Sequence, residues 1–282
     1  MKWLRVVFVP LIFYALCNFH CSKKNNPENV PVVPGDTSTP PPKPYQLVWS
    51  DEFNTDGAPD SSKWNYDVGG NGWGNNELEY YSDARPENAR VVNGNLIIEA
   101  RKESFGGMNY SSARLLTRNK AQWTYGKFEI RAKIPRGRGT WPAIWLLPAD
   151  NPLKWPDDGE LDIMEEVGFQ PNVIYGTAHS KWYNGAQGTQ KGGNLTVSTA
   201  QDSFHVYTLE WTAHKVEWFV DSISYYSYSD PYYGAPAWPY TADFFMILNI
   251  AIGGNWGGQQ GIDNTVFPQQ MLIDYVRIYQ RK

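Results

Sequence analysis

Cysteine is nearly absent from this 282-residue chain. Its two cysteines are Cys17 and Cys21, so residues 22–282 contain none, and no intramolecular disulfide can brace a fold built from them. Long apolar runs are scarce too: the run Val6–Leu16 is too short to span a bilayer.

An excess of basic charge is also missing. The formal net charge is −4, and residues 1–44 contribute five basic and two acidic side chains, which leaves −7 for the rest. Nucleic-acid phosphates require a basic surface. The composition therefore argues against a nucleic-acid partner.

Residues 1–21 resemble an export signal. Lys2 and Arg5 form a short basic start, and an apolar run follows. Cys21, just after that run, is similar to a bacterial lipoprotein attachment site; an ordinary cleaved signal peptide is the alternative. We expect the protein to be exported and to be periplasmic, anchored at the outer membrane or extracellular. Contact with the membrane is expected only through a lipid on Cys21.

Residues 22–44 are rich in Pro, Asn, Ser and Thr and offer almost nothing apolar to bury. Prolines 40–42 and 44 favour extended polyproline conformation. This segment is interpreted as a semi-rigid linker, and the folded domain is expected over residues 45–282.

Helical periodicity is absent from that domain, and short β-branched and aromatic runs recur between Gly, Pro, Asn and Asp clusters. Residues 127–134 alternate polar and apolar, which is typical of an antiparallel strand with one solvated face. The sequence predicts an all-β fold, a sandwich or jelly roll of two antiparallel sheets. The expected strands are Leu96–Ala100, Gly126–Ile134, Val173–His179, Phe204–Trp211, Val216–Val220, Phe244–Ile250 and Met271–Tyr279.

Tryptophan is abundant: twelve of the 13 lie in the predicted domain. Any one of them can be a core residue. However, Trp73, Trp141, Trp182 and Trp256 sit beside glycines or polar residues. Flat aromatic faces stack on the apolar faces of sugar rings. Together these tryptophans indicate a concave carbohydrate groove.

The most informative stretch is residues 157–166, which holds six carboxylates around a short apolar pattern. Strand alternation places Glu160 and Asp162 on one face and Leu161 on the other. Neighbouring carboxylates raise each other's pKa, so that one can stay ionised as a nucleophile while another stays protonated as an acid. Runs of acidic residues are more often only solvated surface, so the surrounding motifs decide.

These motifs resemble family 16 glycoside hydrolases, in particular the laminarinase-like branch that cleaves β-1,3-glucan. The segment Gly159-Glu160-Leu161-Asp162-Ile163-Met164-Glu165 resembles the active-site strand of the family. The other similar segments occur in the same order along the chain: residues 49–53 (WSDEF), 75–81 (NNELEYY), 112–115 (SARL), 139–145 (GTWPAIW), 249–256 (NIAIGGNW) and 273–277 (IDYVR). The resemblance covers nearly all of 45–282 and implies a retaining endo-1,3-β-glucanase.

The resemblance implies that Glu160 is the nucleophile, Asp162 tunes the charge between the two glutamates, and Glu165 is the general acid/base. Strict alternation disagrees, because it places Glu166 rather than Glu165 on the face of Glu160. A β-bulge near residues 163–164 would bring Glu165 round. We therefore predict a bulge and keep Glu166 as the alternative acid.

The resemblance also suggests residues that contact substrate or metal. Trp141 and Trp145 are expected to stack on sugars, and Trp256 to shape the groove. Asn76, Arg114 and His179 are expected to bind hydroxyl groups, with Arg114 equally able to hold the carboxylate cluster in place. No cofactor is expected for catalysis. A structural calcium ion is predicted at Glu52, the Gly94 carbonyl and Asp274, whose oxygen ligands suit Ca²⁺.

Other functions remain open from the sequence. The same catalytic strand could act on mixed-linkage glucan or a marine galactan. A binding module that keeps the fold without catalysis is a further alternative, although three clustered carboxylates argue against it. A monomer is expected.

Overall fold

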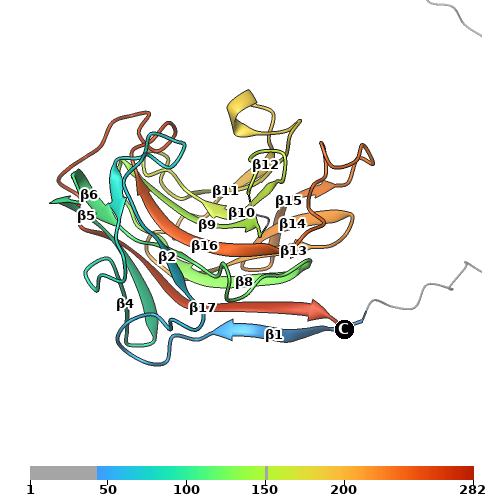
Figure 1. Cartoon of the computed structure of the whole chain (residues 1–282), viewed down its shortest axis with the longest axis horizontal. Helices are drawn as coiled ribbons and strands as arrows, with labels where there is room; N and C mark the ends of the chain where they lie inside the picture. Colours follow the sequence, from blue (N-terminus) through green and yellow to red (C-terminus); the bar gives the residue numbers. More distant parts are fainter. Residues whose placement is uncertain (1–42, 150–151) are drawn as a thin grey trace, which may run out of the picture. The chain divides into compact units, whose positions relative to one another are not determined.

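The computed structural model describes residues 43–149 and 152–282, and these fold almost entirely into strands (Figure 1). The predicted export signal 1–21, with Cys21, and nearly all of the predicted linker lie outside the described residues. The first strand, β1, begins at Tyr45. No helix in the described part of the chain is both long and apolar enough to cross a membrane.

The larger sheet contains ten strands in the described part of the chain, ordered β15-β14-β13-β8-β17-β5-β6-β3, with β1 beside β17 and β4 beside β5. All of its pairs are antiparallel except β3 with β6. The strands are β1 (Tyr45–Asp51), β3 (Glu79–Tyr81), β4 (Ala89–Val92), β5 (Asn95–Phe105), β6 (Met108–Ser112), β8 (Gly126–Lys133), β13 (His205–Trp211), β14 (Lys215–Val220), β15 (Ile223–Ser229) and β17 (Gln269–Arg281).

The smaller sheet has seven strands within the described residues, ordered β12-β11-β10-β9-β16-β7-β2, all antiparallel. They are β2 (Asn65–Asp67), β7 (Arg114–Leu116), β9 (Thr140–Pro148), β10 (Glu160–Glu165), β11 (Val173–His179), β12 (Lys191–Thr196) and β16 (Phe244–Ile252). One 3₁₀ turn, η1 (Gly185–Gln187), lies between β11 and β12. The predicted fold class is confirmed, and each of the seven expected strands overlaps an observed one.

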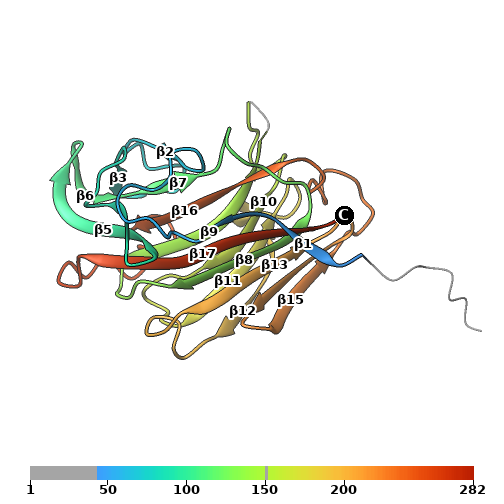
Figure 2. The same cartoon turned by 90° about the horizontal axis from the view of Figure 1, so that it is seen from below.

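The core lies between the two sheets. In β8, the apolar residues Phe128, Ile130 and Ala132 are fully buried, while the charged residues between them face outward, as the alternation predicted. Across the gap, Leu161 and Leu248 of the smaller sheet belong to the same buried cluster. Burying a large apolar side chain stabilises a fold by about 1.5–3 kcal/mol. In Figure 2 the strands of the two sheets run in similar directions, as in an aligned sandwich.

The outer face of the seven-stranded sheet, called the site face below, is the concave one: β16 and its neighbours curve away from β8 and β17 (Figure 1). Strand register lines up one row of residues across this face. Glu165 pairs with Ala143, which pairs with Asn249, which in turn pairs with Arg114 and, through it, Asp67. Residues far apart in the sequence thus meet beside the acidic strand.

Candidate active site

The acidic strand β10 contains the predicted bulge. Its register against β9 shifts between Asp162 and Met164, so that Asp162 pairs with Trp145 while Glu165 pairs with Ala143. Residues 145 and 143 are two apart and point to the same face. Asp162 and Glu165 therefore also share a face, although they are three residues apart. The register against β11 shifts over the same interval.

The interior side of β10 shows why the strand is irregular. Ile163 and Met164 are adjacent in sequence, yet both are buried in the core, which a regular pleat would not allow. The backbone carbonyl of Asp162 accepts a hydrogen bond of 2.7 Å from the indole of Trp218, a buried residue of β14 in the other sheet. Gly176 makes room for that indole, because a Cβ there would lie 2.3 Å from it.

Glu166 is not on the site face. It is fully buried, and its Oε1 accepts hydrogen bonds from the Asn172 backbone N–H (2.6 Å) and from Gln201 Nε2 (2.8 Å). Burial raises the pKa of Glu166 to about 8. The geometry therefore favours Glu165 over Glu166 as the carboxyl that reaches a substrate.

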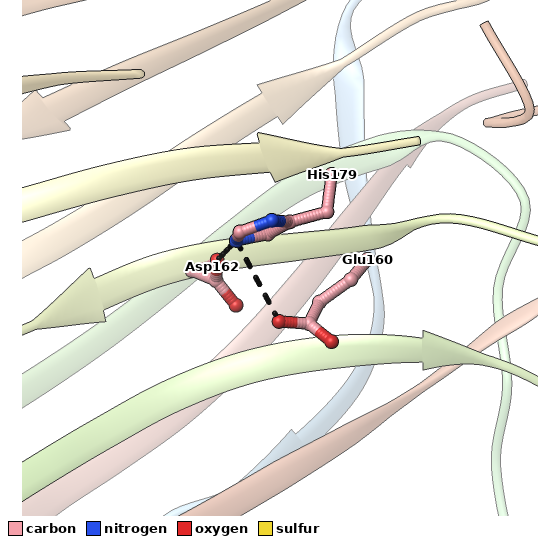
Figure 3. A group of neighbouring side chains, drawn as sticks. All are labelled: Glu160, Asp162 and His179. Carbon is pink, nitrogen blue, oxygen red and sulfur yellow. Dashed lines mark ion pairs between the residues drawn. The ribbon is translucent and has the colours of Figure 1, made fainter. Parts of the chain in front are cut away.

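His179 lies opposite Glu160 on β11 and completes the cluster (Figure 3). Its Nε2 is 3.1 Å from Asp162 Oδ2 and 3.8 Å from Glu160 Oε1. Its Nδ1 accepts a hydrogen bond of 3.1 Å from the Gly185 backbone N–H. A nitrogen that accepts carries no proton, so the ring proton sits on Nε2 and faces the carboxylates. The prediction that His179 binds a sugar hydroxyl stays a prediction.

Electrostatics keep protons on the carboxyl cluster. Burial, followed by the neighbouring Asp162 charge, raises the pKa of Glu160 to about 8. Burial and the Glu165 charge raise the pKa of Asp162 well above its usual range, and burial raises that of Glu165. Three buried negative charges repel one another too strongly to coexist. A hydrogen bond with Glu160 favours the charged form of Asp162 but is outweighed by burial and the Glu165 charge, so the three groups cannot all be ionised together.

Each outer glutamate receives an indole N–H. Trp155 Nε1 donates to Glu160 Oε2, and Trp141 Nε1 donates to Glu165 Oε1, both at 2.9 Å. Both bonds favour the charged form of the acceptor. Sequence analysis did not single out Trp155, because it lies in the loop before β10. Hydrophobic periodicity predicts the faces of strands and gives no position for a side chain in a loop. The one signal for Trp155 was its proximity, five residues before Glu160.

The Glu165 end of the cluster is lined by aromatic rings. Trp256 packs edge-on against Trp141 (centroids 5.5 Å apart) and against Tyr175 of β11 (5.0 Å). Trp256 and Trp141, both expected from the sequence to line the groove, thus lie side by side. Asn76 is exposed on a neighbouring loop, and its Nδ2 donates to Asn255 Oδ1 at 2.8 Å.

Arg114 lies on β7, on the part of the site face between β16 and β2. Its guanidinium carbon lies 4.8 Å from the ring centroids of both Trp73 and Trp145, and its Nε is 3.0 Å from Asp67 Oδ2. Cation–π contacts of this kind fix both rings against the arginine. Arg114 is mostly buried and ion-paired with Asp67, a residue that the sequence did not single out.

Within the described residues, one group of side chains has metal-ligand spacing: Glu160, Asp162 and His179, whose ligand atoms lie within 4.8 Å of one another. His179 does not fit a resident metal, however. Its Nδ1 is engaged by Gly185, and its Nε2 carries the proton, so neither nitrogen offers a free lone pair.

The predicted calcium ligands are engaged elsewhere. Both carboxylate oxygens of Glu52 accept hydrogen bonds from Arg277, at 2.8 and 3.0 Å, and Asp274 is paired with Arg131. Gly94 has a φ of 74° in the turn between β4 and β5, which accounts for the glycine without a metal. As arranged, these residues do not fit a calcium ion unless both ion pairs open, and calcium stays a prediction.

Comparison with known proteins gives a consistent result. Residues 76–277 match the profile of the family described as "Glycosyl hydrolases family 16". The chain is 57% identical over 244 residues to a "Beta-glucanase" of Rhodothermus marinus, covering 84% of this chain and 85% of that protein. The X-ray structure of the laminarinase from Rhodothermus marinus is similar with a TM-score of 0.83 and 56% identity, over 84% of this chain and 98% of that one. SCLam, a non-specific endo-β-1,3(4)-glucanase, is similar with a TM-score of 0.81 and 48% identity, over 85% and 93%.

Proposed function

Because the chain belongs to glycosyl hydrolase family 16, we propose that it is an endo-acting enzyme that hydrolyses laminarin-like β-1,3-glucan with retention of anomeric configuration. The observation that carries the proposal is the bulge in β10, which brings Glu160, Asp162 and Glu165 to one face. Two carboxyl groups on one face are the minimum that a retaining glycosidase requires.

The geometry supports a double displacement. The Glu160 carboxylate attacks the anomeric carbon, and the glycosidic C–O bond breaks as Glu165 gives its proton to the departing oxygen. The sugar is then bound covalently to Glu160. Glu165, now a carboxylate, takes a proton from water, whose oxygen attacks the anomeric carbon and releases Glu160.

Asp162 and His179 prepare Glu160 for this attack. Asp162 hydrogen-bonds Glu160 and is proposed to take over the shared proton as Glu160 ionises, which removes one repulsion between neighbouring charges. The Nε2–H of His179 and the indole of Trp155 present positive dipoles to the same carboxylates. Together they favour an ionised Glu160 in a buried place where burial alone would keep it protonated.

The site face supports glucan binding. Trp141 and Trp145 are proposed to stack on sugar rings next to the catalytic carboxyls, with Trp256 flanking Glu165. Asn76 is exposed and can reach a hydroxyl group if it leaves Asn255. For Arg114 the buried ion pair and the two flanking indoles favour the supporting role over direct sugar contact.

Product analysis tests the proposal. The purified chain should release oligosaccharides from laminarin, and NMR of the first products should show the β-anomer. Lack of activity on laminarin, with activity on agarose or carrageenan, would overturn the substrate assignment. Glu160→Gln and Glu165→Gln should each lose at least about 10³-fold in kcat while still binding laminari-oligosaccharides. Turnover that survives both changes would overturn the assigned roles.

Mixed-linkage β-glucan is a second candidate substrate, favoured by the similarity to the non-specific SCLam enzyme. Rates on lichenan and laminarin, measured side by side, separate the two. A pure binding module would bind both glucans and release no reducing ends from either.

We also propose that the protein works outside the cytoplasm, as a monomer, with the lipid on Cys21 as its only membrane contact. The export-like start of the sequence supports this. Labelling with a radioactive fatty acid, compared between the wild type and Cys21→Ala, tests the lipid. The calcium proposal is tested by the melting temperature of EDTA-treated protein with and without added Ca²⁺.

A further inference from the structure

A second pair of carboxyl groups lies buried away from β10. Glu77, just before β3, is 6% exposed, and Glu79, in β3, is fully buried. Glu77 Oε2 accepts a hydrogen bond from the Tyr81 hydroxyl at 3.0 Å, and its Oε1 accepts one from Asn75 Nδ2 at 3.3 Å. Glu79 Oε2 accepts one from the Ile252 backbone N–H at 2.6 Å. None of the chemistry described above uses this pair.

The pair needs a proton. Glu79 Oε1 is buried and has no hydrogen-bond donor among the described residues. Burial, then the Glu77 charge, raises the pKa of Glu79 well above its usual range, and a hydrogen bond to Glu77 favours the neutral form. A proton on Glu79 that points to Glu77 satisfies both carboxyls. The other titratable groups around them are Tyr81 and Arg114.

The same pair is connected to the site face. The Tyr81 hydroxyl, which donates to Glu77, accepts a hydrogen bond from Asn249 Nδ2 at 3.0 Å. Asn249 Oδ1 in turn accepts one from Trp145 Nε1 at 2.8 Å. The direction of every bond is fixed, because Glu77 is an acceptor at one end and the indole is a donor at the other.

The pair also holds the loop that carries Asn76. Asn75 donates to Glu77 through its side chain, and its carbonyl accepts from the Asn255 backbone N–H at 2.7 Å. Asn76 then bonds Asn255 through its own side chain. One buried carboxylate thus anchors both the Trp145 ring and this loop.

We propose that Glu77 and Glu79 form a one-proton positioning unit, in which Glu79 donates to Glu77 and Glu77 orients Trp145 and the Asn75–Asn76 turn for glucan binding. The proposal rests on the proposed function for its effect on substrate. The hydrogen-bond relay itself does not depend on what the substrate is.

Two matched substitutions test which carboxyl carries the proton. Glu79→Gln keeps a neutral donor facing Glu77, so KM for laminarin should stay within about twofold of the wild type. Glu77→Gln replaces an acceptor oxygen by an amide, so KM should rise about tenfold, with kcat changed less than about threefold. Equal damage from the two changes, or a loss confined to kcat, would overturn the proposal.

A second pair of substitutions, each removing one hydroxyl group, is less disruptive and controls for misfolding. Tyr81→Phe removes the hydroxyl in the relay and should raise KM several-fold. Tyr207→Phe removes a buried hydroxyl of the other sheet that has no hydrogen-bond partner in the described structure, and it should leave KM unchanged. Equal effects of the two changes would refute a specific relay.

An NMR readout separates this proposal from the proposed function. The indole Nε1–H signal of Trp145, assigned with Trp145→Phe, should move in Tyr81→Phe and stay in place in Tyr207→Phe. If the Trp145 signal moves in Tyr81→Phe but the wild-type protein has no activity on laminarin, the proposed function is overturned and the relay is retained. A stationary signal in an active laminarinase would overturn the relay alone.

Discussion

The substitution Glu166→Gln tests whether the bulge in β10 has been read correctly. Glu166 follows Glu165 directly, and a regular strand would place it on the site face. In the structure it is fully buried and pins the Asn172 backbone and the Gln201 side chain through one oxygen. A glutamine keeps that oxygen and cannot ionise. We therefore expect kcat on laminarin to remain near the wild-type value.

The same substitution should change how stability depends on pH. Burial raises the pKa of Glu166 from 4.5 to about 8 in the folded protein. The folded state therefore binds more protons than the unfolded state between these values, and stability falls as the pH rises through that window. Between pH 5 and pH 8 the loss from this group is about 3–4 kcal/mol, from 1.36 kcal/mol for each pKa unit. The glutamine variant should lack this loss.

Urea unfolding followed by tryptophan fluorescence at pH 5 and pH 8 measures the effect. The difference in free energy of unfolding between variant and wild type should shift in favour of Glu166→Gln at pH 8. Glu87→Gln, which removes an exposed carboxylate in the loop before β4, is the matched control and should show no such shift. An unchanged difference at the two pH values would refute the buried, protonated Glu166. A collapse of kcat would restore Glu166 as the acid.

Two indole substitutions should move opposite limbs of the pH profile of kcat/KM. Trp155→Phe removes a donor to Glu160, so the pKa of the ionised nucleophile rises and the acid limb should shift upward by up to about one pH unit. Trp141→Phe removes the donor to Glu165, so the acid keeps its proton longer and the alkaline limb should shift upward by a similar amount. Both shifts are read from rates on laminari-oligosaccharides across the pH range, and a shift of the wrong limb in either variant would contradict the assigned acid and nucleophile.

The long strands could be predicted from sequence because several residues are needed to show a period. β8 alternates over its whole length, and β16 is buried on both faces, so both appear clearly in the sequence. β2, β3 and β7 have three residues each, too few for any period, and all three were missed. β9 was recognised only as part of a motif, and its Pro142 is a residue type that is rare in central strands.

The site could be predicted only in part, for a related reason. The carboxyls of β10 were named from the motif of their strand, and His179 was named as a substrate-binding candidate at the end of the expected strand 173–179. Trp155 and Asp67 were missed, because their roles come from loop geometry and from cross-strand register. Sequence periodicity shows which side chains of one strand share a face. It does not show which residues from distant strands or loops pack against that face.

The bulge in β10 is the clearest case of such a distant cause. Local alternation favours a regular strand, and the motif alone said that the strand deviates. In the structure, the carbonyl of Asp162 is satisfied by Trp218 from the opposite sheet, and Gly176 on the neighbouring strand leaves the space for that indole. An unsatisfied buried carbonyl costs about 1–3 kcal/mol, so the Trp218 indole stabilises the bulge by an amount of this order. A residue more than fifty positions away, in the opposite sheet, therefore helps to fix the register of the β10 carboxyls.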